Sequence, residues 1–379
     1  MRENLPKHGL QLQSTLDADG ALTIRLANVE VSHPGPGEVL IRIEAAPINP
    51  SDMMTMMPAA DPALAQVSGS ARAPSLTLRL SREAADARGG RYGQPLAIGL
   101  EGAGTVIAAG DGSEHLLGQR VAALTLSRGM YAQYATISAA ACTPLPEDVS
   151  AREGAGLFCN PLTALAIAET VRLEGKGALI HTAAASNLGQ MLVKICAEDG
   201  IQLVNVVRRP EQADLLRSLG ATHIVNSSEP GFEEALLAAA IDTGALIAFD
   251  AVGGGTMPGM LLKAMEDAAR TRMTRYGPYG SEELKQVYVY GQLDRSPTVL
   301  RNEHYGLFDL RHWAMPSTLA RVGPVRAAEM QQRVIDGIKT TFASDFSEEI
   351  SLGQMLDPVV VRGYAGMATG RKYLINPTL

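Results

Sequence analysis

The chain has 379 residues, of which 46% are hydrophobic, 19% charged and 4% aromatic, and its formal net charge is -7. The length favours two domains, and the acidic balance argues against nucleic acid or an anionic membrane as a partner, since both attract basic surfaces. Cys142, Cys159 and Cys196 are too few and too scattered for a disulfide framework or a four-cysteine zinc site. The sequence starts without the apolar core of a signal peptide and has no apolar run of about 18 residues. We therefore expect a cytoplasmic protein.

The first part of the chain is expected to form a β-rich domain. Short β-like runs separated by Gly and Pro occur at 38–49, 102–110, 119–125 and 130–138. Short strands with frequent turn signals predict a barrel or a sandwich. Residues 58–91 mix Ala, Ser, Pro and charged residues with little periodicity. We interpret this segment as an inserted loop or short helices, either a solvated excursion or a lid.

From about residue 155 the pattern changes to strands that alternate with helices. Apolar strands are expected at 177–184, 201–207, 223–226, 245–252 and 285–293. Such strands, alternating with helices, predict a parallel sheet covered on both faces. Near residue 325 the chain is expected to return to the first domain. The predicted fold is thus α/β, with one domain made of residues 1–155 and 325–379 and the other of residues 156–324.

A candidate dinucleotide-binding loop follows the strand GALIHTAA and leads into a helix. It consists of Ala184, Ala185, Ser186, Asn187, Leu188 and Gly189. In the fingerprint G-x-G-x-x-G, small residues let the backbone approach a pyrophosphate at a helix N-terminus. Here Ala184 and Ser186 take the first two glycine positions and Gly189 alone remains. The strand before and the helix after predict a cofactor site, with plain tight packing as the alternative.

The residues after the second strand indicate which nucleotide binds. An NAD enzyme places Asp or Glu there for the ribose hydroxyls, whereas this chain has Arg208 and Arg209. Guanidinium groups pair with a 2′-phosphate, so NADPH is predicted, with two exposed arginines at a strand end as the alternative. Strand ends at the same edge add further candidate cofactor contacts, which could also be plain turns: Asn226, Val252, Gly253 and Gly291.

Several motifs occur in the order that one enzyme superfamily uses. They are GPGEVLIRIEAAPINPSD with Asn49, Pro50 and Asp52, GLEGAGTVIAAG with Glu101, FCNPLTAL, VRRPEQADLLRSLGATHIVN, FDAVGG and TGRKYLINP. The chain thereby resembles the medium-chain dehydrogenase/reductase superfamily across nearly its whole length. The resemblance implies a GroES-like β-barrel domain and a Rossmann domain with a doubly wound parallel sheet. Two branches fit best, the quinone oxidoreductases and the 2-enoyl thioester reductases.

The resemblance also bears on the metal and the substrate. Zinc-dependent alcohol dehydrogenases of this superfamily carry a Cys where this chain has Asn49 and a His where it has Leu100. Leucine has no lone pair and Asn is a poor zinc ligand, so we expect no metal. Without a Lewis acid, a quinone or another conjugated enone is a better hydride acceptor than an isolated ketone. The negative charge that forms when it accepts hydride is delocalised over the conjugated system. NADPH-dependent quinone or enone reduction is thus predicted. The alternatives are a 2-enoyl-CoA or acyl-carrier-protein reductase and an NADPH-binding sensor or structural protein with little catalysis.

Asn49 and Tyr92 are the candidate catalytic residues. The resemblance places Asn49 near the nicotinamide, where its amide could orient the substrate or the carboxamide, and Thr163 near the nicotinamide ribose or ring. It also implies that Asp52 is structural. Tyr92 lies where related reductases place a tyrosine in the cleft, and in the enoyl reductases that phenol donates a proton. Because residues 58–91 come directly before it, a wall or packing role for Tyr92 is the alternative.

Two further interpretations concern binding surfaces. Arg311, Arg321 and Arg326 could converge on the phosphates of a CoA-like substrate, or they could be scattered over a solvated face. Relatives pair edge strands of their cofactor domains into a continuous sheet, and residues 288–293 are a plausible edge. A homodimer is therefore expected.

Overall fold

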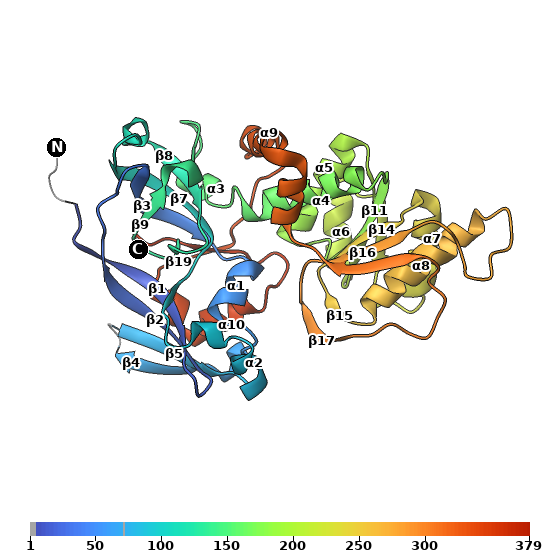
Figure 1. The fold of residues 1–379 in the computed structure, drawn as a ribbon, viewed down its shortest axis with the longest axis horizontal. Helices are drawn as coiled ribbons and strands as arrows, with labels where there is room; N and C mark the ends of the chain where they lie inside the picture. The colour runs from blue at the N-terminus through green and yellow to red at the C-terminus, as the bar shows by residue number, and fades with distance from the viewer. Residues whose placement is uncertain (1–4, 71–72) are drawn as a thin grey trace. The chain divides into compact units, whose positions relative to one another are not determined.

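The structure is a computed structural model that describes residues 5–70 and 73–379. The chain divides into two compact units (Figure 1). Unit 1 comprises Met1–Cys159 and Ala343–Leu379, and unit 2 comprises Asn160–Phe342. The described part of the chain contains no helix with the length and hydropathy needed to cross a membrane.

Unit 1 is built from two sheets. The first has the strand order β4-β5-β2-β1-β6, and the second has the order β10-β8-β7-β3-β20-β19, with β9 also paired to β3. The first sheet consists of β1 (His8–Leu16), β2 (Ala21–Glu30), β4 (Gln66–Ser70), β5 (Ala73–Arg79) and β6 (Leu96–Ala97). The second consists of β3 (Glu38–Pro47), β7 (Glu101–Ala109), β8 (Arg120–Leu124), β9 (Tyr134–Ser138), β10 (Cys142–Pro144), β19 (Glu348–Ile350) and β20 (Tyr373–Ile375). Its helices are α1 (Pro50–Met56), α2 (Arg82–Asp86), α3 (Ala151–Gly154) and α10 (Pro358–Ala365).

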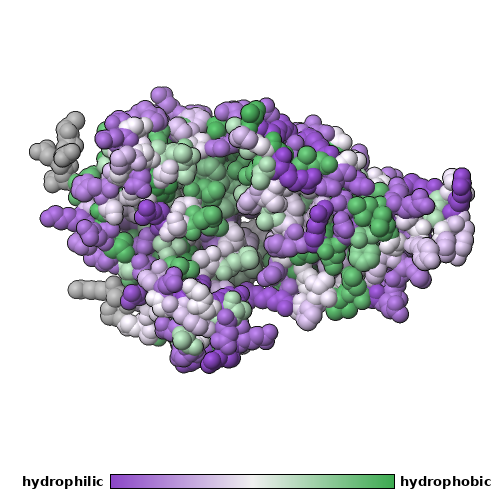
Figure 2. All heavy atoms as spheres, in the orientation of Figure 1, coloured by the Kyte–Doolittle hydropathy of each residue, from purple (hydrophilic) through white to green (hydrophobic). Residues whose placement is uncertain are grey.

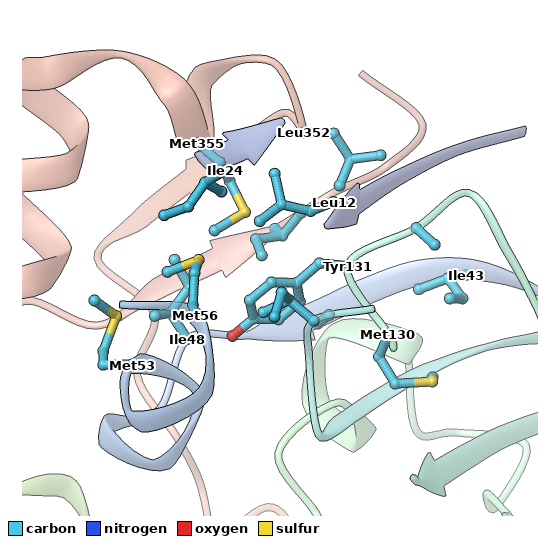
Figure 3. Packing of buried hydrophobic residues seen from close by; sticks show 14 of the residues in the cluster. Leu12, Ile24, Ile43, Ile48, Met53, Met56, Met130, Tyr131, Leu352 and Met355 are labelled. Atoms are coloured by element: carbon cyan, nitrogen blue, oxygen red, sulfur yellow. The ribbon is translucent and has the colours of Figure 1, made fainter. Parts of the chain in front are cut away.

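Side chains from both sheets meet in one hydrophobic core. Along β1, Leu12, Ser14 and Leu16 alternate with residues that are more exposed, so this face points inward. Tyr131 lies among core residues that include Leu12, and its hydroxyl points toward the side where Met56 of α1 packs (Figure 3). The β-rich first domain expected from the sequence is therefore a packed β domain, and residues of α1 belong to its core.

The segment 58–91 contains short helices, as we expected, among them α2 and a 3-10 helix at Pro62–Leu64, but it also contains two strands that we did not expect. Strands β4 and β5 form a hairpin, and β5 pairs with β2 over five residues. Leu76, Leu78 and Leu80 alternate with more exposed neighbours and are buried against the core of unit 1. This period of two is visible in SLTLRL, but the flanking Ala, Ser and Pro residues concealed it. Residues 71–72 of the segment lie outside the described residues.

Unit 2 contains a six-stranded parallel sheet with the order β13-β12-β11-β14-β16-β18. This is the doubly wound order in which the first strand lies beside the second and the fourth. The strands are β11 (Ala178–Thr182), β12 (Gln202–Val207), β13 (His223–Asn226), β14 (Ile247–Asp250), β16 (Lys285–Val289) and β18 (Phe308–His312). A small parallel pair, β15 (Gly253–Gly255) and β17 (Asp294–Thr298), lies outside this sheet. The expected Rossmann domain is confirmed.

Helices cover both faces of this sheet, as Figure 1 shows. They are α4 (Cys159–Leu173), α5 (Asn187–Asp199), α6 (Pro210–Ser218), α7 (Phe232–Thr243), α8 (Met257–Thr271) and α9 (Met315–Asp336). Residues of α7 and α8 share one apolar cluster with strand residues such as Ile180 and Val204. Residues 288–293 do not form an edge, because β18 pairs with β16 and takes the edge position instead.

The return to unit 1 occurs at Ala343, later than the expected residue 325. Helix α9 stays with unit 2 because its arginines form ion pairs there. Arg326 pairs with Glu169 of α4 at 2.9 Å, and Arg333 pairs with Asp199 at 2.8 Å. These ion pairs attach α9 to helices of unit 2, and unit 2 therefore includes α9 and ends at Phe342.

Candidate functional site

The loop between β11 and α5 is shaped by small residues. Ala184 and Ala185 are buried, and Ala183 has a positive φ of 50°, a conformation that L-residues rarely adopt. The Ser186 hydroxyl accepts a hydrogen bond from the Gly189 N–H at 3.1 Å and so caps α5. A Cβ atom at Gly189 would lie 2.0 Å from the Ala184 carbonyl oxygen. Only glycine therefore lets the helix approach the loop this closely.

This geometry suits the pyrophosphate of a dinucleotide. The first turn of a helix has backbone N–H groups without partners inside the helix, and its dipole favours negative charge. Helix α5 has 13 residues and begins at Asn187, directly after the loop. The side chain of Leu188, the one large apolar residue of the loop, is buried. The loop therefore presents backbone groups rather than bulky side chains. The six candidate residues of the loop thus form one structural element at the carboxyl end of β11.

A buried carboxylate that the sequence reasoning missed ties neighbouring strand ends together. Asp250, the last residue of β14, accepts a hydrogen bond from the Thr182 hydroxyl at 2.6 Å. Its two oxygens also accept the N–H groups of Val252 and Gly253, each at 2.9 Å. Burial raises the pKa of Asp250, and these donors act in the opposite sense. The carboxylate therefore shapes the turn containing the candidates Val252 and Gly253, and the motif FDAVGG was its signal.

Gly291 belongs to the same edge of the sheet. A Cβ atom at Gly291 would lie 2.5 Å from the Ala251 carbonyl oxygen, so the backbone after β16 passes close to the turn after β14. Thr163, in the first turns of α4, places its hydroxyl 3.7 Å from the Met315 sulfur. Both residues are placed in unit 2, Gly291 at the carboxyl edge and Thr163 on a covering helix.

Arg208 and Arg209 follow β12 and are exposed. Their backbone N–H groups donate to the Gln212 side chain at 3.0 and 3.1 Å, which fixes the turn into α6. Neither guanidinium forms an ion pair with any side chain in the described ranges. The Ser228 hydroxyl joins the neighbouring turn to this one by donating to the Arg208 carbonyl at 2.8 Å. Asn226, in contrast, donates to Glu229 at 2.8 Å.

In unit 1, Asn49 lies at the centre of a buried polar cluster. It is the N-cap residue of α1 and is 2% exposed. Its amide Nδ2 donates to Glu101 Oε1 at 2.7 Å. The other Glu101 oxygen accepts the N–H groups of Phe158 and Cys159, at 2.8 and 2.9 Å. Glu101 thus orients the Asn49 amide and also holds the backbone where α4 begins.

Asp52 is the second carboxyl group of this cluster. It accepts the N–H groups of Asn49 and Leu100, both at 2.9 Å. Burial nevertheless raises the pKa of Asp52 from its ordinary 3.8 to about 6, although these bonds and one from Tyr131 favour the ionised form. Asp52 therefore holds the turn that begins with Asn49, in keeping with the structural role expected for it.

Lys372 and Cys159 complete the cluster, and sequence reasoning assigned neither of them to the site. Lys372 Nζ donates to Asn49 Oδ1 at 3.4 Å. The Cys159 thiol lies beside Glu101, and burial raises its pKa well above the ordinary value, so it stays protonated at neutral pH. The motif TGRKYLINP carries Lys372, but nothing in its spacing indicates that this lysine reaches Asn49.

Tyr92 is not part of this cluster. It lies after a 3-10 turn (Gly89–Arg91), and its hydroxyl donates to Asp86 of α2 at 3.1 Å. Partial desolvation and the Asp86 carboxylate raise the pKa of the phenol. Its neighbour Arg91 donates instead to the Thr55 carbonyl at 3.0 Å and so connects this turn to α1.

The three arginines considered for CoA phosphates are engaged separately. Arg311 donates to the Tyr288 hydroxyl at 2.6 Å, Arg321 pairs with Glu174 at 2.8 Å, and Arg326 pairs with Glu169. The contacts of Arg321 and Arg326 attach α9 to α4, and Arg311 contacts the neighbouring strand. These arginines do not converge on a shared phosphate site.

Within the described ranges, no group of three or more His, Cys, Asp and Glu side chains is arranged to hold a metal ion. The turn that could supply ligands instead presents an amide already bonded to Glu101 and Lys372. Leu100, the position for which the sequence already argued against a zinc ligand, has no donor atom in its side chain.

Two known protein families match the chain. The family described as "Alcohol dehydrogenase GroES-like domain" matches residues 35–147, and the one described as "Zinc-binding dehydrogenase" matches residues 188–296. Together the matches span more than half of the chain and fall in units 1 and 2, respectively.

Individual proteins are similar over different lengths. The mitochondrial enoyl-[acyl-carrier-protein] reductase of Bos taurus is 27% identical over 221 residues, which is 56% of this chain and 51% of the bovine protein. The chain thus spans about half the length of that relative. A structure described as a putative NADPH:quinone reductase from Mesorhizobium loti has a TM-score of 0.74 and 25% identity, covering 99% of this chain and 100% of that chain. A mycobacterial protein solved with NADPH shares the fold, with a TM-score of 0.68, 19% identity and coverage of 98% and 99%.

The Asp52 carboxyl should make stability depend on pH. Its folded-state pKa is raised, so between pH 4 and 6 the folded chain keeps a proton that the unfolded chain has lost. This stabilisation is present at low pH and is lost as the pH rises through 6. Relative to Asp52→Asn, the free energy of unfolding of the wild type should fall by about 2 kcal/mol between pH 4.5 and 7.5. Urea unfolding of both proteins at each pH measures their free energies of unfolding. If the wild type minus Asp52→Asn difference stays constant or grows with pH, the raised pKa of Asp52 is contradicted.

Proposed function

This chain belongs to the medium-chain dehydrogenase/reductase superfamily, in its quinone oxidoreductase and enoyl reductase branch, and we propose that it reduces a quinone or another α,β-unsaturated carbonyl compound with NADPH and without zinc. The observation that carries the proposal is the loop Ala184–Gly189, where Gly189 alone permits the close approach of α5. A loop of this kind, at the carboxyl end of the first strand of a doubly wound sheet, is the usual place for a dinucleotide pyrophosphate.

We propose NADPH rather than NADH because of the charge that follows β12. Arg208 and Arg209 are exposed cations, and no acidic residue occupies the position that would bind the ribose hydroxyls of NADH. A 2′-phosphate pairs with such guanidinium groups, whereas an acid would repel it. When bound, NADPH supplies the hydride. Gly253 and Gly291, at the carboxyl edge of the sheet in unit 2, would border its nicotinamide end.

The choice of acceptor rests on the donors at the Asn49 turn. An amide fixed by Glu101 and a leucine at position 100 do not suit zinc. Charge on the substrate oxygen must then be stabilised by hydrogen bonds and by delocalisation within the substrate itself. Quinones and enones meet this requirement, and simple alcohols and isolated ketones do not.

Reduction of a 2-enoyl thioester is the second candidate. It is favoured by the similarity to the bovine enoyl-[acyl-carrier-protein] reductase, and the same hydride chemistry would serve. The separate engagement of Arg311, Arg321 and Arg326 gives no support to a CoA phosphate site. A third reading, an NADPH-binding sensor or structural protein, predicts tight NADPH binding without turnover on any acceptor.

We propose that Tyr92 forms part of the wall of the site and does not donate the proton. Its hydroxyl proton is directed to the Asp86 carboxylate at 3.1 Å, within the segment that joins β5 to β6. A Tyr92→Phe protein that bound NADPH normally but lost turnover on every acceptor would contradict this role.

We propose further that the protein is a homodimer joined through β18. This strand pairs with β16 along one side only, among the described strands, which leaves its other side available. Leu307, which directly precedes this strand, is a large apolar residue that is 56% exposed. Figure 2 shows apolar side chains gathered over the part of unit 2 where β16 and α8 are drawn.

The function is tested by following NADPH oxidation with quinones, enones and enoyl thioesters under identical conditions. We expect 1,4-benzoquinone and 1,4-naphthoquinone to be reduced, with kcat/KM at least tenfold higher with NADPH than with NADH. A crotonyl-CoA activity above that on quinones would favour the enoyl reductase. Oxidation of a simple alcohol that requires zinc would overturn the proposal.

The homodimer is tested by light scattering. The expected mass is twice the 40.1 kDa of one chain. Leu307→Glu should shift the population toward the monomer, because it places a charge beside the β18 edge. A wild-type mass of a single chain across the micromolar range would refute the assembly.

A further inference from the structure

Lys372 is held beside Asn49 by the sheet of unit 1. It directly precedes β20, which pairs with the end of β3, and the Ile48 N–H donates to the Tyr373 carbonyl at 3.0 Å. The Lys372 carbonyl is fixed in turn by the Ser347 N–H at 3.0 Å. The backbone of Lys372 and of the following residue Tyr373 is thus anchored, and the lysine side chain extends to Asn49 Oδ1 at 3.4 Å.

The surroundings of the ammonium group are charged and partly apolar. Asp52 and Glu101 are both buried, and every hydrogen bond described for them above comes from a neutral donor. The positive charge of Lys372 interacts with both carboxyl groups, and Lys372 Nζ also lies 5.5 Å from the centre of the Phe346 ring. The residue keeps part of its surface exposed, unlike Asn49, Asp52 and Glu101. Its charge can therefore reach a molecule placed against the cluster.

We propose that Lys372 is a catalytic residue that stabilises and protonates the oxyanion formed on the acceptor. This inference rests on the proposed function, because it requires an acceptor carbonyl near Asn49. The Asn49 amide, fixed between Lys372 and Glu101, would then orient the same carbonyl group. A preorganised cation in a water-poor site is worth more than in water, and loss of one such donor costs about 10²- to 10³-fold in kcat.

The reaction balances with groups that the protein and solvent supply. Hydride transfer adds two electrons and one hydrogen nucleus to the acceptor, NADPH becomes NADP⁺, and the acceptor carbonyl oxygen becomes anionic. Lys372 Nζ donates one proton to this oxygen, an O–H bond forms, and the lysine is left as a neutral amine. A proton from water then restores the ammonium group.

The ionisation of Lys372 supports this role. Burial lowers the pKa of the ammonium group, while the charges of Glu101 and Asp52 act in the opposite sense. A lysine with a lowered pKa donates a proton more readily than an exposed one. The cationic form is present below this pKa, so kcat/KM should fall as the pH rises through it.

The test compares Lys372→Met and Lys372→Arg with the wild type and with Arg371→Met. Arg371 is a matched control because its exposed guanidinium contacts Tyr373 and Glu348 instead of the cluster. Three quantities are measured: the Kd of NADPH, the pH profile of kcat/KM with 1,4-naphthoquinone, and the Kd of the 2-hydroxy-1,4-naphthoquinone anion, which resembles the oxyanion.

For Lys372→Met we expect kcat/KM to fall at least about 100-fold and the anion to bind at least about tenfold more weakly, with the NADPH Kd changed less than threefold. Lys372→Arg should keep the affinity for the anion and move the alkaline decline to higher pH, because guanidinium remains charged, but its kcat should fall because guanidinium does not give up its proton. Arg371→Met should match the wild type in all three measurements.

The proposal is overturned if Lys372→Met loses NADPH affinity while the anion binds unchanged, or if its kcat/KM stays within threefold of the wild type. If Lys372→Met fails to fold, the arginine variant decides, and an alkaline decline that does not move rejects the role. A wild type that oxidises no NADPH with any acceptor contradicts the proposed function instead, and binding of the anion then still reports on Lys372 alone.

Discussion

The close approach of helix α5 to the turn after β11 is the constraint on which the proposed cofactor site depends. A Cβ atom at Gly189 would meet the Ala184 carbonyl oxygen at 2.0 Å, so the helix can sit here only with glycine at that position. Ser186 then caps the helix, and Ala183 accepts a positive φ that turns the chain away from the strand. The fingerprint glycines missing from this loop are replaced by alanine and serine, which are small enough to keep the backbone accessible.

The second determinant is a set of buried charges in unit 1. Glu101 and Asp52 hold the backbone on either side of the Asn49 turn, and Lys372 adds a positive charge at the exposed side of the cluster. In such surroundings an amide keeps one orientation, because both of its ends have partners. In the role that we propose for Lys372, neutral and cationic donors would act together on an acceptor oxygen as it gains negative charge, which is the requirement for reduction without a metal.

The sequence predicted the two-domain fold because its signals are local: apolar strands alternating with helices, and a family motif in each half. It failed where the period of two was concealed by flanking residues, as at Leu76 and Leu78 of the hairpin, which lies in a segment where we expected a loop or short helices. Contacts between distant segments were also beyond it. Nothing local in TGRKYLINP shows that Lys372 reaches Asn49, 323 residues earlier, because β20 brings it there through pairing with β3. The hydrogen bond of Tyr92 to Asp86 likewise depends on the path of α2.

The central claim is that unit 2 binds a phosphorylated pyridine nucleotide at the Gly189 loop and beside Arg208. Calorimetric titration of the wild type and Arg208→Ala with NADPH and with NADH tests this without requiring an acceptor. The account predicts that the wild type binds NADPH at least about tenfold more tightly than NADH, or 1.4 kcal/mol, and that Arg208→Ala loses most of this preference. A wild type without measurable affinity for either nucleotide would contradict it.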